Sequence, residues 1–283
     1  MKKILTTALV AGALFSAKAE DKIVIDGSTT VGPIAKAFAE YFMEKNPQVN
    51  VTVSESGSGN GAKSLVNSTA DIGAMSRPMK DKEFNAAAAN GAQPVAHVVA
   101  FDGLPILVNP SNPIKNLTIK QVRDIYTGKI TNWKELGGAN KKIVMISRDT
   151  NSGTYETFYK LVMTEKINGE KTKHKIAKTA EYVGSNGAIR QRVQSTPAAI
   201  GYAGLGFVDK TVKALDINGI HPTAVTVKSG LYPIARPLFM YTNKYPKLGS
   251  ALYQFITIYL SKDGQEIVEE IGFVPVTDYD LDW

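Results

Sequence analysis

Three short loops rich in glycine and hydroxyl residues each follow a strand-like stretch and precede a stretch with helical spacing. They lie at residues 27–33, 56–61 and 147–154. Strands that alternate with helices along a chain indicate the α/β class. A loop that joins a strand to the first turn of a helix leaves the N–H groups of that turn without helical partners. The sequence therefore predicts an α/β fold with several helix N-termini just beyond strand ends.

The hydrophobic periodicity supports this class. Residues 22–25 predict a short strand, and the apolar spacing from Ile34 to Phe42 predicts a helix that Pro47 ends. The alternating valines of residues 49–53 predict a second strand. Later patterns predict strands at 143–146, 200–203 and 238–241, and helices at 118–126, 154–162, 188–193, 248–260 and 264–271.

Each of the three loops has residues suited to holding an oxyanion. A helix N-terminus offers N–H donors and the positive end of the helix dipole. Glycine allows the backbone to come close to a ligand, and hydroxyl groups add donors. One such loop is most simply an ordinary helix cap, but three of them in one chain favour a common anion site. Arg148 lies in the third loop and could bind an oxyanion with two N–H groups. Arg77 is a second candidate, and a surface ion pair is the alternative for both.

An acidic residue in the site would distinguish between oxyanions. Hydrogen phosphate carries a proton that a carboxylate can accept, whereas sulfate at neutral pH does not, so such a residue would favour phosphate. Asp102 lies in an apolar strand region, where it is either a solvated strand end or this acceptor. Asp149 is the other candidate, although it also suits the capping of the following turn. Residues 57–64 approach the P-loop pattern, but Ala62 replaces its second glycine.

The N-terminus has the pattern of a secretory signal peptide. Lys2 and Lys3 precede an apolar run over residues 4–15, and Ala17-Lys18-Ala19 fits a cleavage site. The run is shorter than the roughly 20 residues that span a bilayer, and no later run is long enough either. We therefore expect residues 1–19 to be removed and the mature protein to be free in the periplasm. The chain has no cysteine that could carry a lipid anchor.

Charge and residue pattern disfavour several functional classes. The full chain has 33 Lys plus Arg and 26 Asp plus Glu; loss of three lysines with residues 1–19 would leave 30 against 26, a net charge of +4. This mild excess favours anionic ligands, and no dense basic run interleaved with aromatic residues indicates nucleic-acid binding. His97, His174 and His221 lack metal-ligand spacing, and no G-x-S-x-G motif occurs. We therefore expect no metal, no cofactor and no enzymatic activity, with a secreted phosphatase as the enzymatic alternative.

Longer motifs extend over almost the whole mature chain. They are DGSTTVGP (26–33), SGSGNGAKSL (56–65), DIGAMSRP (71–78), FDGLPILVNPSNP (101–113), IYTGKITNW (125–133), SRDTNSGT (147–154), IGYAGL (200–205), YPIARPLF (232–239) and GFVPV (272–276). Through these motifs together, the chain resembles the periplasmic phosphate-binding proteins of phosphate-specific ABC transporters.

The resemblance implies a type II periplasmic binding protein fold with two lobes and a two-strand hinge. Lobe I would comprise residues 20–107 plus 240–283, and lobe II residues 108–239. The chain would cross between them near Val108-Asn109 and near 238–241. The protein would be a monomer that captures inorganic phosphate between the lobes and delivers it to a membrane permease. The same fold binding sulfate, molybdate or tungstate is the alternative.

The resemblance also implies the ligand-binding residues. By motif position these are Thr29, Thr30, Ser58, Arg148, Ser152, Gly153 and Thr154, with Ser76 and Arg77 as further candidates. Some family members have an aspartate at the position of Ser76, which accepts the phosphate proton there. Because this chain has serine at that position, the acceptor role is assigned to Asp102.

Overall fold

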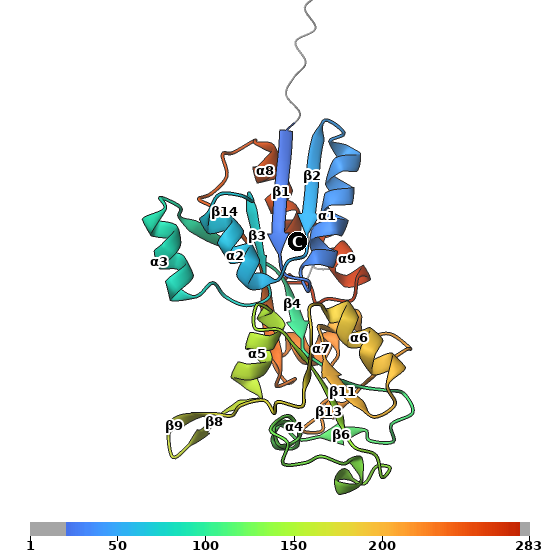
Figure 1. Ribbon diagram of the computed structural model, residues 1–283. Coiled ribbons are helices and arrows are strands. Elements are labelled where there is room, and N and C mark those ends of the chain that lie inside the picture. Colours follow the sequence, from blue (N-terminus) through green and yellow to red (C-terminus); the bar gives the residue numbers. More distant parts are fainter. Residues whose placement is uncertain (1–20, 278–283) are drawn as a thin grey trace, which may run out of the picture.

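The computed structural model describes residues 21–277, so the predicted signal peptide at 1–19 lies outside the described residues. The described chain forms two lobes, one above the other in Figure 1, each built on a five-stranded sheet with helices packed against it. None of the helices within residues 21–277 combines the length and the apolar character that crossing a bilayer requires.

Lobe I contains the sheet with strand order β2-β1-β3-β14-β4. Its strands are β1 (Asp21–Gly27), β2 (Val49–Ser54), β3 (Ile72–Met75), β4 (Pro94–Gly103) and β14 (Ala235–Asn243). Its helices are α1 (Gly32–Lys45), α2 (Ser58–Val66), α3 (Asp81–Ala89), α8 (Ala251–Ile256), α9 (Lys262–Glu270) and the 3₁₀ turn η3 (Thr257–Leu260). Strand β1 is parallel to β2 and β3, whereas β14 is antiparallel to β3 and β4. Both ends of the described chain therefore contribute to one lobe.

The apolar stripe of α1 fixes that helix on the sheet. Ile34, Phe38 and Phe42 recur at helical spacing and are all buried in one core with Ile25 and Ile72. Pro33 occupies the first turn, where its missing N–H costs no helical hydrogen bond. This packing places the N-terminus of α1 directly after the end of β1.

Lobe II contains the sheet with strand order β10-β7-β11-β5-β12. Its strands are β5 (Ile106–Val108), β7 (Val144–Arg148), β10 (Glu181–Val183), β11 (Ala199–Tyr202) and β12 (Lys213–Ala214). Two small pairs, β6 (Asn116–Leu117) with β13 (Asp216–Ile217) and the hairpin β8 (Thr164–Ile167) with β9 (Glu170–Lys173), lie outside it. Its helical segments are α4 (Ile119–Tyr126), η1 (Trp133–Leu136), α5 (Gly153–Leu161), α6 (Asn186–Ser195), η2 (Leu205–Phe207) and α7 (Ala224–Lys228).

Three buried aromatic rings hold α5 against the sheet of lobe II. Phe158 of α5 stacks on Tyr202 of β11 with ring centroids 3.9 Å apart, and Tyr126 of α4 meets Phe158 edge-on at 4.7 Å. Aromatic pairs of this kind contribute about 0.5–1.5 kcal/mol beyond the area they bury. This aromatic cluster therefore fixes the position of α5 and of its first turn relative to the sheet.

The chain passes between the lobes at two neighbouring places. Strand β4 ends at Gly103 and β5 starts the second sheet at Ile106; on the return, the chain re-enters the first sheet at Ala235 in β14. Both changes of sheet lie before the expected crossing points near 108–109 and 238–241. Pro105 has no N–H group that could continue the hydrogen bonds of the first sheet, which explains why β4 ends at Gly103. The division of the lobes at 107/108 and 239/240 stays a prediction.

Candidate functional site

Four helices begin where the two lobes meet (Figure 1). These are α1 and α2 of lobe I, and α5 and α6 of lobe II. Ser152 caps α5, because its Oγ accepts hydrogen bonds from the N–H groups of Thr154 and Tyr155, each at 3.2 Å. Ser185 caps α6 in the same way through Ala188 N at 3.0 Å. The positive ends of several helix dipoles thus point into one region, which favours an anion there.

Buried hydroxyl groups from both lobes lie together in this region. Ser58 Oγ is 3.2 Å from Ser76 Oγ, and Thr30 Oγ1 is 3.0 Å from Thr154 Oγ1. The second contact joins lobe I to lobe II. The side chains of all four residues are about 1% exposed, and Thr29 is also buried. The structure therefore brings together the hydroxyl residues that the loops and their resemblance predicted.

Gly153 lets the two lobes approach each other at this point. A methyl group built on its Cα would lie 2.5 Å from Ser58 Oγ and 2.6 Å from Ser76 Oγ. Real Cβ atoms essentially never show such distances, so any larger residue would force the two serine hydroxyls or the first turn of α5 to shift.

Arg148 is a buried cation at the end of β7. Its Nη2 donates to Gly184 O at 2.8 Å and its Nε to Val183 O at 3.2 Å, and the residue is 1% exposed. Its Nη1 has no hydrogen-bond partner within residues 21–277. Burial lowers the pKa of the guanidinium to about 10, although the nearby Asp149 carboxylate opposes this shift. A buried cation with an unpaired donor is the strongest local indication of an anionic ligand.

Asp102 and Arg236 form a second buried charged group. They stand directly opposite each other in the β4–β14 ladder. Asp102 Oδ2 accepts from Arg236 Nη2 at 2.8 Å and from Nε at 3.0 Å, and Oδ1 accepts from Leu205 N at 2.8 Å. Burial raises the pKa of Asp102, and the Arg236 charge opposes that rise.

Arg236 connects this pair to the hydroxyl cluster. Its Nη2 lies 3.0 Å from Thr154 Oγ1 and 3.3 Å from Thr30 Oγ1. Arg236 therefore stands between Asp102 and the hydroxyl residues. The role of Asp102 as proton acceptor stays a prediction, and Asp149 Oδ1 accepts from Asn151 N at 2.9 Å, as a turn cap would.

Sequence reasoning did not assign Arg236 or Asn186 to the site. Asn186 Nδ2 donates to Thr30 Oγ1 at 2.8 Å, and the residue is fully buried. The sequence contains a feature that could have indicated each of these two residues. Arg236 interrupts a mostly apolar strand, and Gly184-Ser185-Asn186-Gly187 is a fourth glycine and hydroxyl loop before a helix.

The guanidinium of Arg77 is engaged by carboxylates instead of the hydroxyl cluster. It forms two hydrogen bonds to Glu83, at 2.7 and 2.8 Å, and an ion pair with Glu156 at 3.0 Å. Lys80 also contacts Glu156, at 2.7 Å. The reason is local, because Glu83 lies in the first turn of α3 beside Arg77. Glu156 belongs to α5, so these contacts join the lobes rather than line the predicted ligand site.

The serine hydroxyl groups at the site are engaged by backbone N–H groups or by each other. Ser28 and Ser152 accept hydrogen bonds from backbone N–H groups, and Ser58 contacts Ser76. The three histidines lie elsewhere, bonded to Thr242, Glu165 and Asp216. Nowhere in residues 21–277 do three or more His, Cys, Asp or Glu residues form a group that could hold a metal ion.

Comparison with known proteins identifies relatives of the whole chain. Residues 15–263 match the model of the PBP superfamily domain. The phosphate-binding protein PstS of Bacillus subtilis is 35% identical over 93% of this chain and 85% of its own length. PstS of Borreliella burgdorferi is 35% identical over 98% of this chain and 99% of its own. A Clostridium perfringens substrate-binding protein, assigned to phosphate ABC transport and solved with bound phosphate, superposes with a TM-score of 0.82. It is 34% identical and covers 91% of this chain and 100% of its own. The two-lobed α/β fold expected from the sequence is confirmed by this likeness.

Proposed function

The chain belongs to the PBP superfamily and, within it, to the PstS family of phosphate-binding proteins, and on this premise we propose that it captures inorganic phosphate between its lobes and delivers it to the permease of an ABC transporter. The relatives bear names that state phosphate binding, and the structure from C. perfringens was solved with phosphate. Phosphate would contact hydroxyl groups of both lobes, so its binding would favour the closed arrangement.

One observation carries this proposal. Arg148 is buried, charged at neutral pH and left with an unpaired Nη1 donor among the described residues. An unpaired buried cation is costly, and an oxyanion at Nη1 would remove that cost. The buried hydroxyl residues Thr30, Ser58 and Thr154 would supply neutral donors to the anion. The buried charges of Arg148, Arg236 and Asp102 sum to one positive charge, which suits an anion.

The same residues support selectivity for a protonated oxyanion. We propose that Asp102, held by Arg236 on one oxygen, accepts the proton of hydrogen phosphate, so that the site disfavours a tetrahedral anion without a proton. A carboxylate oxygen accepts up to two hydrogen bonds, and Oδ1 of Asp102 receives one, from Leu205 N. Sulfate, molybdate and tungstate bring no proton at neutral pH and would meet this carboxylate unfavourably.

A transport protein without enzymatic activity fits the serine environments. Catalytic serines are activated by a neighbouring base, whereas the oxygens of Ser28 and Ser152 receive backbone N–H bonds. We further propose that the protein is exported, acts in the periplasm and is a monomer. Size-exclusion chromatography with light scattering tests the monomer, and N-terminal sequencing of protein from the native host tests the cleavage after Ala19.

Calorimetric titration tests the ligand directly. The mature protein is unfolded, dialysed and refolded to remove bound anion, then titrated with phosphate, sulfate, molybdate and tungstate at neutral pH. We expect tight binding of phosphate only. Binding of another oxyanion in preference to phosphate would overturn the ligand, and hydrolysis of a chromogenic phosphate ester that Arg148→Ala abolishes would restore the phosphatase alternative.

A further inference from the structure

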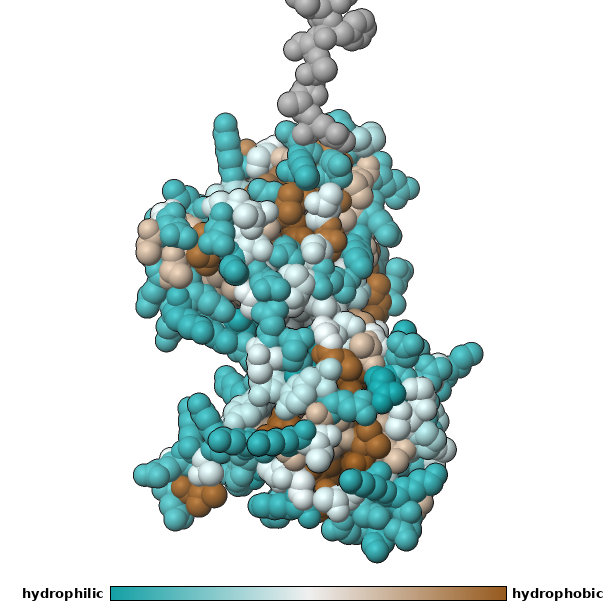
Figure 2. Space-filling model, viewed as in Figure 1, coloured by the Kyte–Doolittle hydropathy of each residue, from teal (hydrophilic) through white to brown (hydrophobic). Residues whose placement is uncertain are grey.

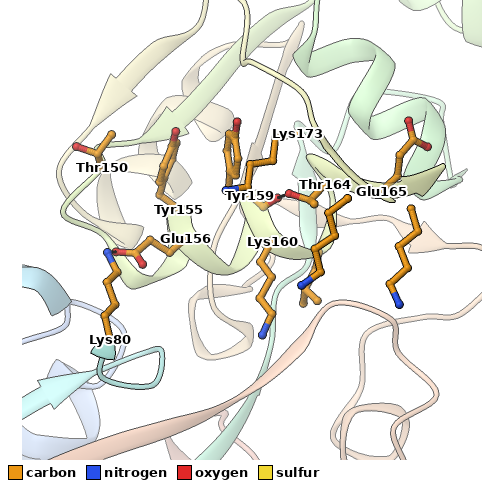
Figure 3. A pocket seen from close by; sticks show the side chains of 12 residues that line it. Lys80, Thr150, Tyr155, Glu156, Tyr159, Lys160, Thr164, Glu165 and Lys173 are labelled. Atoms are coloured by element: carbon orange, nitrogen blue, oxygen red, sulfur yellow. Dashed lines mark hydrogen bonds and ion pairs between the residues drawn. The ribbon is translucent and has the colours of Figure 1, made fainter. Parts of the chain in front are cut away.

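A cavity of about 640 Å³ lies on the surface outside the oxyanion site, between α5 and the β8–β9 hairpin (Figure 3). We call it the α5–hairpin groove. Lys80 of lobe I closes one end, and the side chains that matter for its chemistry are those of Tyr155, Tyr159, Lys166, Lys171 and Lys173. Its size is within the range of sites that hold ligands or side chains of a partner.

Two tyrosines give the groove an apolar wall. Tyr155 and Tyr159 are one turn apart on α5, and Figure 3 shows their rings side by side. Their ring centroids are 5.7 Å apart, and both residues are half-buried. Such a pair offers a surface on which aromatic or aliphatic side chains can pack.

The hairpin directs lysines into the groove at an energetic cost. Lys166 stands directly opposite Lys171, and Thr164 opposite Lys173, so these four side chains share one face. Like charges directly opposite each other destabilise a strand pair. Glu165 and Glu170 belong to the other face. The hairpin therefore gathers its lysines on one face, and Glu165 is the one hairpin carboxylate that also lines the groove.

The carboxylates of the groove are already neutralised. Glu156 pairs with Lys80 and Arg77, and Glu165 pairs with Arg123 and His174. Within residues 21–277, no hydrogen bond or ion pair involves the amines of Lys160, Lys166, Lys171 or Lys173. In Figure 2, hydrophilic side chains cover the notch between the protruding hairpin and the upper lobe. The groove thus has an uncompensated positive charge beside an apolar wall.

We propose that the α5–hairpin groove docks an acidic segment of a partner protein, with an aromatic or aliphatic side chain of that segment on the tyrosine pair. The charge complementarity comes from lysines spread along the hairpin and α5, which suits an extended chain better than a single small anion. Lys80 comes from lobe I, whereas the other groove residues belong to lobe II. The groove is therefore complete only when the lobes are closed, and the partner recognises the closed form. This last point rests on the proposed function, in which phosphate closes the lobes.

A random copolymer of glutamate and tyrosine is a suitable probe, because it carries both carboxylates and aromatic rings. Its binding to the full mature chain is measured by fluorescence anisotropy at fixed ionic strength, with the protein either stripped of anion or saturated with phosphate. We expect at least about fivefold tighter binding with phosphate. The double substitution Lys166→Glu with Lys171→Glu should weaken it about tenfold or more.

The matched control is Lys175→Glu with Lys178→Glu, which makes the same charge change at exposed lysines of lobe II outside the groove. We expect it to alter copolymer binding less than about twofold and both pairs to leave phosphate affinity unchanged. Equal weakening by the control pair, or no copolymer binding by the wild type, would contradict the proposal that the groove docks an acidic segment. Equal affinity with and without phosphate, in protein that binds phosphate by calorimetry, would overturn recognition of the closed form.

Vesicles of phosphatidylglycerol separate a protein partner from a membrane surface. If they bind more tightly than the copolymer and with the same dependence on Lys166 and Lys171, the groove faces lipid and the proposal is wrong. Failure of phosphate to bind in the calorimeter would instead contradict the proposed function, while the comparison of the two lysine pairs on stripped protein would still decide whether the groove binds acidic chains.

Discussion

Thr30 Oγ1 lies 3.0 Å from Thr154 Oγ1, and this contact joins the first loop of lobe I to the first turn of α5 in lobe II, 124 residues later in the chain. Arg236 and Asn186 also contact Thr30 Oγ1. One hydroxyl thus meets groups from β14, α5 and α6. A ligand that bonds to this cluster would hold all three elements, which is why substitutions near it should change lobe closure as well as affinity.

Replacing Arg148 with alanine should weaken phosphate binding at least about tenfold, or about 1.4 kcal/mol. The substitution removes the buried cation whose Nη1 has no partner among the described residues. Calorimetry on the refolded variant measures the effect. Arg190→Ala is the control, because Arg190 is a more exposed arginine of lobe II that pairs with Asp209. Unchanged affinity in folded Arg148→Ala protein would remove Arg148 from the site.

The affinity for phosphate should decline as the pH rises through about 10, where Arg148 loses its proton. The charged guanidinium attracts the anion below this pH and no longer does so above it. In anion-free protein the same group acts in the opposite direction. Its pKa is lower folded than unfolded, so the folded state binds fewer protons in this window and its unfolding free energy rises with pH.

Titrations between pH 8 and pH 11 check the decline, because an arginine with its ordinary pKa would stay charged throughout this range. Arg148→Ala should bind weakly with a flatter pH profile. A wild-type profile that matches that of Arg148→Ala would show that another group causes the decline.

Replacing Gly153 with alanine should weaken phosphate binding about tenfold or more without unfolding the protein. The new methyl group would collide with Ser58 Oγ and Ser76 Oγ and keep the lobes apart. Small-angle scattering with saturating phosphate should give a larger radius of gyration than the wild type. Gly187→Ala is matched, since a methyl group there meets only Ser185 Oγ, at 3.8 Å. Full affinity and full compaction in Gly153→Ala would contradict the close approach.

Replacing Asp102 with asparagine should narrow the gap between phosphate and sulfate affinity, because the neutral side chain no longer repels an unprotonated anion. It should also lower the free energy of unfolding by several kcal/mol, since Arg236 keeps its buried charge and loses the negative charge that balances it. Competition calorimetry and urea unfolding measure the two effects. A wild-type selectivity ratio in the folded variant would transfer the acceptor role to Asp149 or to another group.

Replacing Glu156 with glutamine should weaken phosphate binding by a factor of about two to five. The carboxylate of Glu156 joins α5 of lobe II to Arg77 and Lys80 of lobe I, so we expect this contact to be lost when the lobes separate. The loss should appear mainly as faster release of phosphate in stopped-flow measurements. Glu181→Gln, which breaks an ion pair within lobe II, should leave the release rate unchanged. Equal rates for the two variants would show that the interlobe ion pairs do not stabilise closure.

Local patterns predicted the parts of the site that are built from consecutive residues. Each glycine and hydroxyl loop contains its own strand end and helix start, so its role could be inferred without knowing the rest of the fold. The partner of Asp102 could not be inferred in this way, because it depends on the register of two antiparallel strands whose paired residues are 134 positions apart.

The surroundings of Arg77 were equally hidden in the sequence. An arginine beside a serine and a proline suits an anion site, but its fate depends on Glu156, which reaches it only when α5 packs against lobe I. Lys171 and Lys173 are exposed, and nothing in their local sequence indicates which residues face them. Their position opposite β8 follows from a hairpin whose exposed, charged residues show no apolar alternation.

The ion pair of Asp102 on β4 and Arg236 on β14 lies beside the hinge between the lobes, since one passage between the lobes follows β4 and the other precedes β14. A small rotation about that point becomes a much larger displacement at the far ends of the lobes, as with any lever. An ion that does not balance the charges of Asp102 and Arg236 would then also not bring about the rotation that closes the lobes. The selectivity between ions and the lobe closure that follows ion binding would then depend on the same few atoms.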